Sequence, residues 1–156
     1  LAVVLALLAK VALLALIGSV STRWMLLAIF AAHVVSRTWP LLLIRLMPHV
    51  GDAAGSKSKP LADQISGRSL LAASLWCFSA LALVYLAQTA MHLGARAVWC
   101  GLDWLPLTVA VLASGLAWAY VGRLLWRRLQ GFTGDGLGAT QQVCELDFYL
   151  GLAVTL

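Results

Sequence analysis

The amino-acid sequence predicts an all-α protein: a polytopic bundle of transmembrane helices that forms a single integral-membrane domain over residues 1–156. Hydrophobic residues make up 62% of the chain and charged residues only 11%, a composition typical of membrane proteins. The apolar runs are also long, and a helix needs roughly 20 apolar residues to cross a hydrocarbon core of ~30 Å. Four segments meet this length and a fifth is shorter, so we expect about five membrane segments.

The segments follow one another along the chain with polar stretches between them. The first runs from Leu1 to about Val20, the second from Trp24 to about Met47, the third from about Ser69 to Leu93, and the fourth from about Val98 to Val121. The fifth, Val143 to Leu156, is only half composed of apolar residues. The chain begins inside an apolar run without an initiator methionine, so we interpret it as the C-terminal part of a longer chain.

Basic residues in two loops, at about 49–68 and 122–142, predict the orientation, because Lys and Arg near helix ends resist translocation. They are Lys57, Lys59, Arg68, Arg123, Arg127 and Arg128. Both loops should lie on the cytoplasmic side of a bacterial inner membrane. The net charge of +5 reflects this asymmetry and an attraction to anionic lipid head groups, and it requires no nucleic-acid partner.

The three cysteines argue against two common kinds of site. Cys77, Cys100 and Cys144 share no metal-ligand spacing. They therefore predict neither a zinc site nor a disulfide framework.

Ionisable residues inside the apolar segments require an explanation, since each costs on the order of 3 kcal/mol at the centre of a membrane helix. Lys10 lies midway along the first segment, where it either snorkels or contacts a neighbouring carbonyl, or serves as an inward-facing functional cation. His33, Ser36 and Arg37 share one face of the second segment. That face is either a polar packing cluster or places the Arg37 guanidinium against an anion such as phosphate.

The stretch HVGDAAGSKSKPLADQIS, residues 49–66, combines small residues with Lys57 and Lys59. Small residues let backbone N–H groups approach an anion, and lysines add positive charge, which suits a phosphate. The spacing of a P-loop is absent. An ordinary solvated loop is the alternative interpretation.

The stretch GFTGDGLGATQQVCELD, residues 131–147, places acidic residues next to an apolar run. Thr133 is expected to cap a helix whose first turn contains Asp135, and Gln142 and Glu145 share a face of it. A divalent cation coordinated by Asp135, with Glu145 helping, would compensate these charges and bind phosphate oxygens. The alternative is a capped turn in which Glu145 pairs with a buried Arg or Lys.

The motifs together resemble the cobalamin synthase family, the adenosylcobinamide-GDP ribazoletransferases, in its C-terminal portion. The segment LLWRRLQGFTGDGLGATQQVCEL resembles the family's basic helix end, its G-x-T-G-D-x-L-G-A box and the glutamate that follows. LALLAKVALLA resembles a family helix with a central lysine, here Lys10. AAHVVSRTWPLLLIRLMPHV resembles a helix with a Ser-Arg pair, here Ser36 and Arg37.

The resemblance implies a magnesium-dependent transfer that completes the nucleotide loop of a corrinoid. A ribose hydroxyl of α-ribazole, or of its phosphate, would attack the cobinamide-side phosphorus of adenosylcobinamide-GDP, giving adenosylcobalamin or its phosphate and releasing GMP. It implies catalytic roles for Asp135 and Glu145, with Asp135 as the Mg²⁺ ligand. The substrate-binding residues that it implies are Lys10, Ser36, Arg37, Lys57, Lys59, Thr133 and Gly134.

The chain departs from the family pattern in two places. The upstream acidic box of the family, of the H-x-D-G-L-A-D-x-x-D-G kind, does not occur in this sequence, so we expect these residues alone to be inactive. The loop with Lys57 and Lys59 also differs from the commoner family form.

Two functions of other classes remain open from the residues. A small transporter or channel subunit would line its path with Lys10, His33 and Arg37. A structural subunit, or a homo-oligomer, would pack through the small residues Ser69, Ala73 and Cys77.

Overall fold

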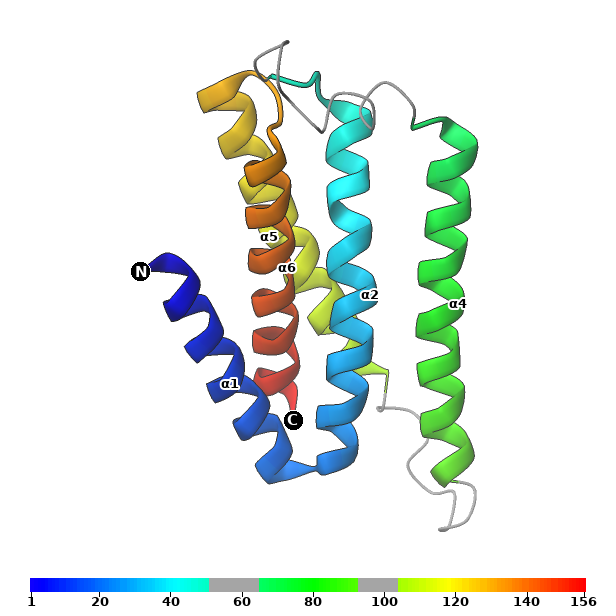
Figure 1. The fold of residues 1–156 in the computed structure, drawn as a ribbon. Helices are drawn as coiled ribbons and strands as arrows, with labels where there is room; N and C mark the ends of the chain where they lie inside the picture. Colours follow the sequence, from blue (N-terminus) through cyan, green and yellow to red (C-terminus); the bar gives the residue numbers. More distant parts are fainter. Residues whose placement is uncertain (51–64, 93–103) are drawn as a thin grey trace.

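A computed structural model describes residues 1–50, 65–92 and 104–156. The described residues form five α-helices, drawn in Figure 1: α1 (Ala2–Val20), α2 (Thr22–Leu46), α4 (Gly67–His92), α5 (Leu105–Leu129) and α6 (Gly134–Thr155). This confirms the all-α class. Lys57 and Lys59 lie outside the described residues.

Four of the helices are long and apolar enough to cross a membrane: α1, α2, α4 over Gly67–Leu86, and α5. Helix α6 is not among them, because Gln141, Gln142, Glu145 and Asp147 interrupt its apolar residues. Large apolar side chains such as Leu8, Trp76 and Phe78 are exposed on α1 and α4. Lipid tails would cover such side chains in a membrane, which agrees with the prediction of four full-length segments. The fifth segment, predicted as Val143 to Leu156, lies in a helix that already begins at Gly134.

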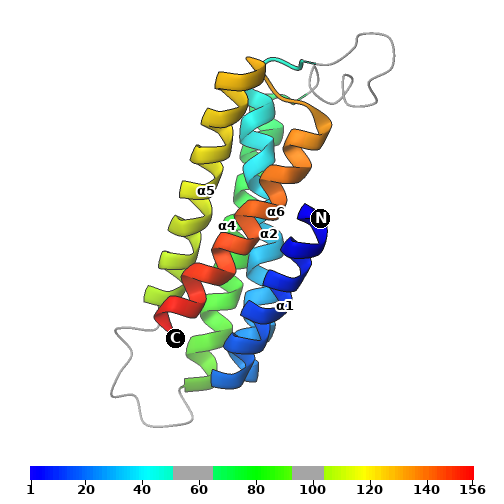
Figure 2. The same cartoon turned by 90° about the vertical axis from the view of Figure 1, so that its left-hand side faces the viewer.

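Helix α6 packs against α5, α2 and α1, and α2 also contacts α4 (Figures 1 and 2). Small residues make the closest approaches. Ala28 and Ala32 of α2 are fully buried in the same cluster as Phe148 of α6. A Cβ on Gly151 of α6 would lie 2.9 Å from the Cα of Ala110 on α5, so this crossing leaves room only for glycine.

The chain after α2 is joined to the turn between α5 and α6. The N–H of Val50 donates to the carbonyl oxygen of Phe132 at 2.9 Å, and the N–H of Phe132 donates to the carbonyl of Pro48 at 3.0 Å. A side chain at Gly131 would collide with that carbonyl of Pro48. The two loops predicted to share one side therefore begin at the same end of the bundle; the side of the membrane stays a prediction.

The predicted limits of the fourth segment, and the loop predicted at 122–142, are wrong. Helix α5 starts at Leu105 and continues to Leu129, and only residues 130–133 separate it from α6. Hydropathy falls after Val121, but the helix continues because its arginines lie on an exposed face while Leu125 stays buried. It ends at Gln130, which adopts the left-handed conformation with φ 58°.

Candidate functional site

An ion pair joins the middle of α1 to the middle of α6. The Lys10 Nζ lies 2.8 Å from the Glu145 Oε2, and the two side chains are only 14% and 6% exposed. Helix α6 carries Glu145 on the face that packs against α1 and α2. Of the two interpretations of Glu145 left open by the sequence, the structure shows the buried pair with a lysine.

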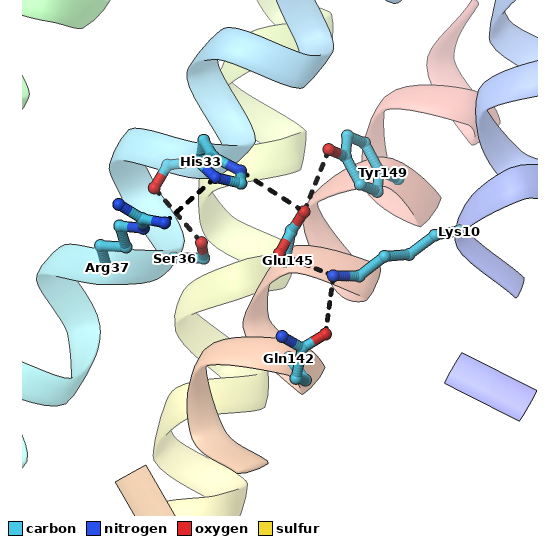
Figure 3. Close-up of polar contacts among 7 residues, drawn as sticks. All are labelled: Lys10, His33, Ser36, Arg37, Gln142, Glu145 and Tyr149. Carbon is cyan, nitrogen blue, oxygen red and sulfur yellow. Dashed lines mark hydrogen bonds and ion pairs between the residues drawn. The ribbon is translucent and has the colours of Figure 1, made fainter. Parts of the chain in front are cut away.

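Further polar groups surround this ion pair, as Figure 3 shows. Lys10 also donates to the Gln142 Oε1 at 2.7 Å, and the Tyr149 hydroxyl donates to the Glu145 Oε1 at 3.3 Å. Gln142, Glu145 and Tyr149 are spaced three and four residues apart, so they share one face of α6. The sequence indicated Gln142 beside Glu145; it missed Tyr149, whose only signal was its spacing of four from Glu145.

Helix α2 contributes an imidazole and a guanidinium to the same group. The His33 Nδ1 lies 3.7 Å from the Glu145 Oε1, and the Arg37 NH2 nitrogen lies 3.3 Å from the His33 Nε2. We call the six connected side chains the polar cluster: Lys10, His33, Arg37, Gln142, Glu145 and Tyr149. The cluster lies near the middle of three helices, where placing each ionisable group is energetically costly.

Ser36 lies next to the polar cluster but is oriented differently. Its side chain is fully buried and its hydroxyl donates to the backbone carbonyl of His33 at 3.4 Å. Ser36 was predicted to contact substrate, but it has no surface on which a substrate could bind. Arg37, the other residue of the predicted Ser-Arg pair, is exposed.

A cavity of about 630 Å³ separates α2 from α4 beside Arg37. Its lining is mainly apolar, with Val34 and Trp76 among the side chains, and Arg37 is its one charged residue among those described. The volume falls in the range of small-molecule sites. Arg37 thus borders a space large enough to accept an anionic group.

The glycine-rich stretch forms the start of α6, as the sequence predicted. The Thr133 hydroxyl accepts a hydrogen bond from the Gly136 N–H at 3.1 Å and caps the helix, with Asp135 in its exposed first turn. Asp135, Gly138 and Gln142 line a second cavity, of about 570 Å³, between α1 and α6. Gly134 is exposed at the same helix end.

The two carboxylates predicted to cooperate are far apart. Asp135 precedes Glu145 by ten positions on one helix, which at a rise of about 1.5 Å per residue places them about 15 Å apart along its axis. The hypothesis that Glu145 helps Asp135 to hold one cation is therefore wrong for this structure. Glu145 has Lys10 as its counter-ion instead.

The described residues do not form a complete magnesium site. They contain no group of three or more His, Cys, Asp or Glu side chains placed to hold a metal ion. Mg²⁺ is commonly held by one or two carboxylates together with substrate phosphates and water. Within the described part of the chain, Asp135 is an exposed carboxylate that fits one such ligand position.

Comparison with known proteins matches residues 1–153 to the sequence model of the cobalamin-5-phosphate synthase family. The adenosylcobinamide-GDP ribazoletransferase of Albidiferax ferrireducens is 65% identical over 155 residues, which are 99% of this chain and 55% of the relative. Its counterpart in a Polaromonas species is 53% identical over 168 residues, with the same coverage of 99% and 55%. The Vibrio cholerae enzyme of that name is 37% identical over 125 residues, 80% of this chain and 41% of the relative.

The chain thus spans about half the length of the curated relatives that it matches over its full extent. No solved structure gives a significant match.

Proposed function

The chain belongs to the cobalamin-5-phosphate synthase family, and from this membership we propose that it takes part in joining adenosylcobinamide-GDP to α-ribazole or α-ribazole phosphate. A ribose hydroxyl oxygen forms a bond to the cobinamide-side phosphorus. The bond from that phosphorus to the bridging oxygen breaks, GMP leaves with the bridging oxygen, and the hydroxyl proton passes to a base. The product is adenosylcobalamin or its phosphate.

The observation that carries this proposal is the polar cluster. A buried carboxylate, a lysine, an imidazole and a guanidinium meet near the middle of helices that are otherwise apolar. Transfer of a phosphoryl group depends mainly on positioning and on neutralising charge, and this requires fixed cations and polar groups. A bundle that only packed its helices would not need such groups at this depth.

The site residues take different parts in the proposed reaction. Arg37 contacts a phosphate of the donor substrate from the cavity between α2 and α4, because its planar guanidinium matches phosphate oxygens. Lys10 holds Glu145 in place, and Glu145 is the buried catalytic carboxylate. The remaining substrate contacts of the proposal are Thr133, Gly134, Lys57 and Lys59; Ser36 is fully buried and is not among them.

Asp135 is the second catalytic carboxylate of the proposal and its Mg²⁺ ligand. It is exposed at the N-terminus of α6, next to the cavity shared with α1. The described residues supply one position of the ion's coordination shell, so further ligands must come from substrate phosphates, water or residues outside the described ranges.

The membrane setting of the proposal follows from the arginines. We place the chain in a bacterial inner membrane, with the end of the bundle that carries Phe132 facing the cytoplasm. Arg123, Arg127 and Arg128 are exposed near this end of α5, where anionic head groups attract them. Relatives that are named as transferases do not support the transporter alternative.

The test is the release of GMP that depends on α-ribazole, measured with the full-length gene product in proteoliposomes. We expect Asp135→Asn to lower kcat/KM by roughly 10²-fold, since a neutral amide cannot replace a carboxylate that holds charge in the site. Asp147→Asn is the matched control, because Asp147 lies on the same helix outside the polar cluster. Equal rates for the two variants and the wild type would remove Asp135 from the site.

A further inference from the structure

We propose that His33 is a positioning residue for Arg37. Its neutral imidazole accepts a hydrogen bond from the guanidinium at Nε2 and turns a protonated Nδ1 toward the Glu145 carboxylate, which lies 3.7 Å away, beyond direct hydrogen-bonding distance. The ring thereby fixes Arg37 beside the cavity between α2 and α4, where a phosphate binds. The identity of that phosphate, as part of the donor substrate, rests on the proposed function.

The position of His33 supports this role directly. Its two ring nitrogens face two different groups: Nδ1 lies 3.7 Å from the Glu145 Oε1, and Nε2 lies 3.3 Å from the Arg37 NH2 nitrogen. Figure 3 shows the ring between the carboxylate and the guanidinium. The His33 side chain is 52% exposed, so it is not a filler of the core. Its geometry therefore needs an explanation other than packing.

The charges on either side of the ring select its tautomer. A guanidinium has only donors, so the nitrogen that faces Arg37 must be the acceptor, and the other nitrogen then carries the proton toward the carboxylate. A doubly protonated ring would place two cations 3.3 Å apart and leave Arg37 without its acceptor. Glu145 in turn is fixed by Lys10 and Tyr149, so the carboxylate offers the ring a stationary partner.

Arg37 needs a further partner that the described residues do not supply. A guanidinium carries five N–H donors. Within the described part of the chain, the Arg37 guanidinium forms a side-chain hydrogen bond with His33. Arg37 is also one of the residues that line the apolar cavity of about 630 Å³. In such surroundings a phosphate oxyanion, bound through parallel N–H···O bonds, is the favoured ligand.

The experiment compares His33→Ala and His33→Gln in the full-length gene product by steady-state kinetics. We expect His33→Ala to raise the KM for adenosylcobinamide-GDP roughly tenfold, because an unfixed guanidinium loses a charge-assisted contact. kcat should change by less than about threefold. His33→Gln should restore the KM, since an amide supplies one donor and one acceptor. Ser74→Ala is the control, because among the described residues its hydroxyl donates to the carbonyl of Leu70 in its own helix. A KM in His33→Ala within about twofold of wild type would overturn the inference.

Two further arms distinguish the possible failures. The rise in the donor KM of His33→Ala should be the same in a phosphate-free maltoside detergent and in phospholipid vesicles. A rise confined to vesicles would show that the Arg37 guanidinium binds lipid phosphate, and it would overturn the role of Arg37 toward the donor. ¹⁵N spectra of histidine-labelled protein, with His33 assigned by its loss in His33→Gln, should show a protonated Nδ1 and a bare Nε2. The opposite tautomer would overturn the linkage. The spectra report the tautomer of His33 whether or not the enzyme is active. A wild type that releases no GMP would therefore contradict the proposed function without changing the tautomer found for His33.

Discussion

Removal of Lys10 is the perturbation whose energetic consequence follows most directly from the structure. The variant Lys10→Met keeps the length of the apolar stem without the ammonium group, and it leaves Glu145, which is 6% exposed, without its counter-ion at 2.8 Å. Breaking one side of a buried ion pair costs about 3–5 kcal/mol, because the remaining charge stays desolvated. We therefore expect the free energy of unfolding to fall by about 3 kcal/mol or more.

A double-mutant cycle with Glu145→Gln isolates the pair from its surroundings. The double variant should be less destabilised than the sum of the single variants, with a coupling of about 1.5–3 kcal/mol, because it leaves no unpaired buried charge. The assay is denaturant unfolding of the purified protein in mixed micelles. Arg123→Met is the control, since Arg123 is exposed and should change stability by less than about 0.5 kcal/mol. Additive single effects, or a loss below about 1 kcal/mol in Lys10→Met, would refute the reasoning.

The same unfolding assay checks three more substitutions. Tyr149→Phe removes the hydroxyl that donates to Glu145 at 3.3 Å and should destabilise by about 1–2 kcal/mol; an unchanged midpoint would show that this hydrogen bond does not form. Gly151→Ala places a methyl group 2.9 Å from the backbone of α5 and should lower the free energy of unfolding by about 1–3 kcal/mol. Its control, Gly138→Ala, meets no atom within 4 Å and should be neutral or slightly stabilising. Equal effects of the two substitutions would contradict the close crossing of α5 and α6. Thr133→Ala removes the cap of α6 and should cost about 1 kcal/mol, while Thr133→Ser keeps the hydroxyl and the stability; a loss in both variants would argue against capping.

The sequence was sufficient for features that depend on local chemistry. Segment length and apolarity predicted the membrane-spanning helices because backbone groups in lipid must be satisfied within a helix. The cap at Thr133 was also predictable, because a hydroxyl just before a helix lies next to the free backbone N–H groups of the first turn and accepts from one of them. Successive membrane segments run in alternating directions, so the loop after the second segment and the loop after the fourth segment were predicted to lie on the same side.

Features that depend on tertiary packing could not be obtained in this way. The sequence showed that Glu145 needs a cation but left open which one, because Lys10 approaches it only when α1 lies along α6. The extent of α5 was misjudged because an arginine on an exposed helix face lowers hydropathy without ending the helix. Tyr149 was missed because an aromatic residue in an apolar run is usually interpreted as a core residue. Only the structure shows that its hydroxyl donates to Glu145.

The central claim is that Arg37 and Glu145, joined through His33, act as one functional unit. The most direct measurement is kcat/KM for GMP release by Arg37→Gln, Glu145→Gln and the double variant of the full-length gene product, each in proteoliposomes. Residues that act as a unit show strongly non-additive effects, so the double variant should be about as slow as the slower single variant. Losses that multiply would show that the two residues act independently and would contradict the account.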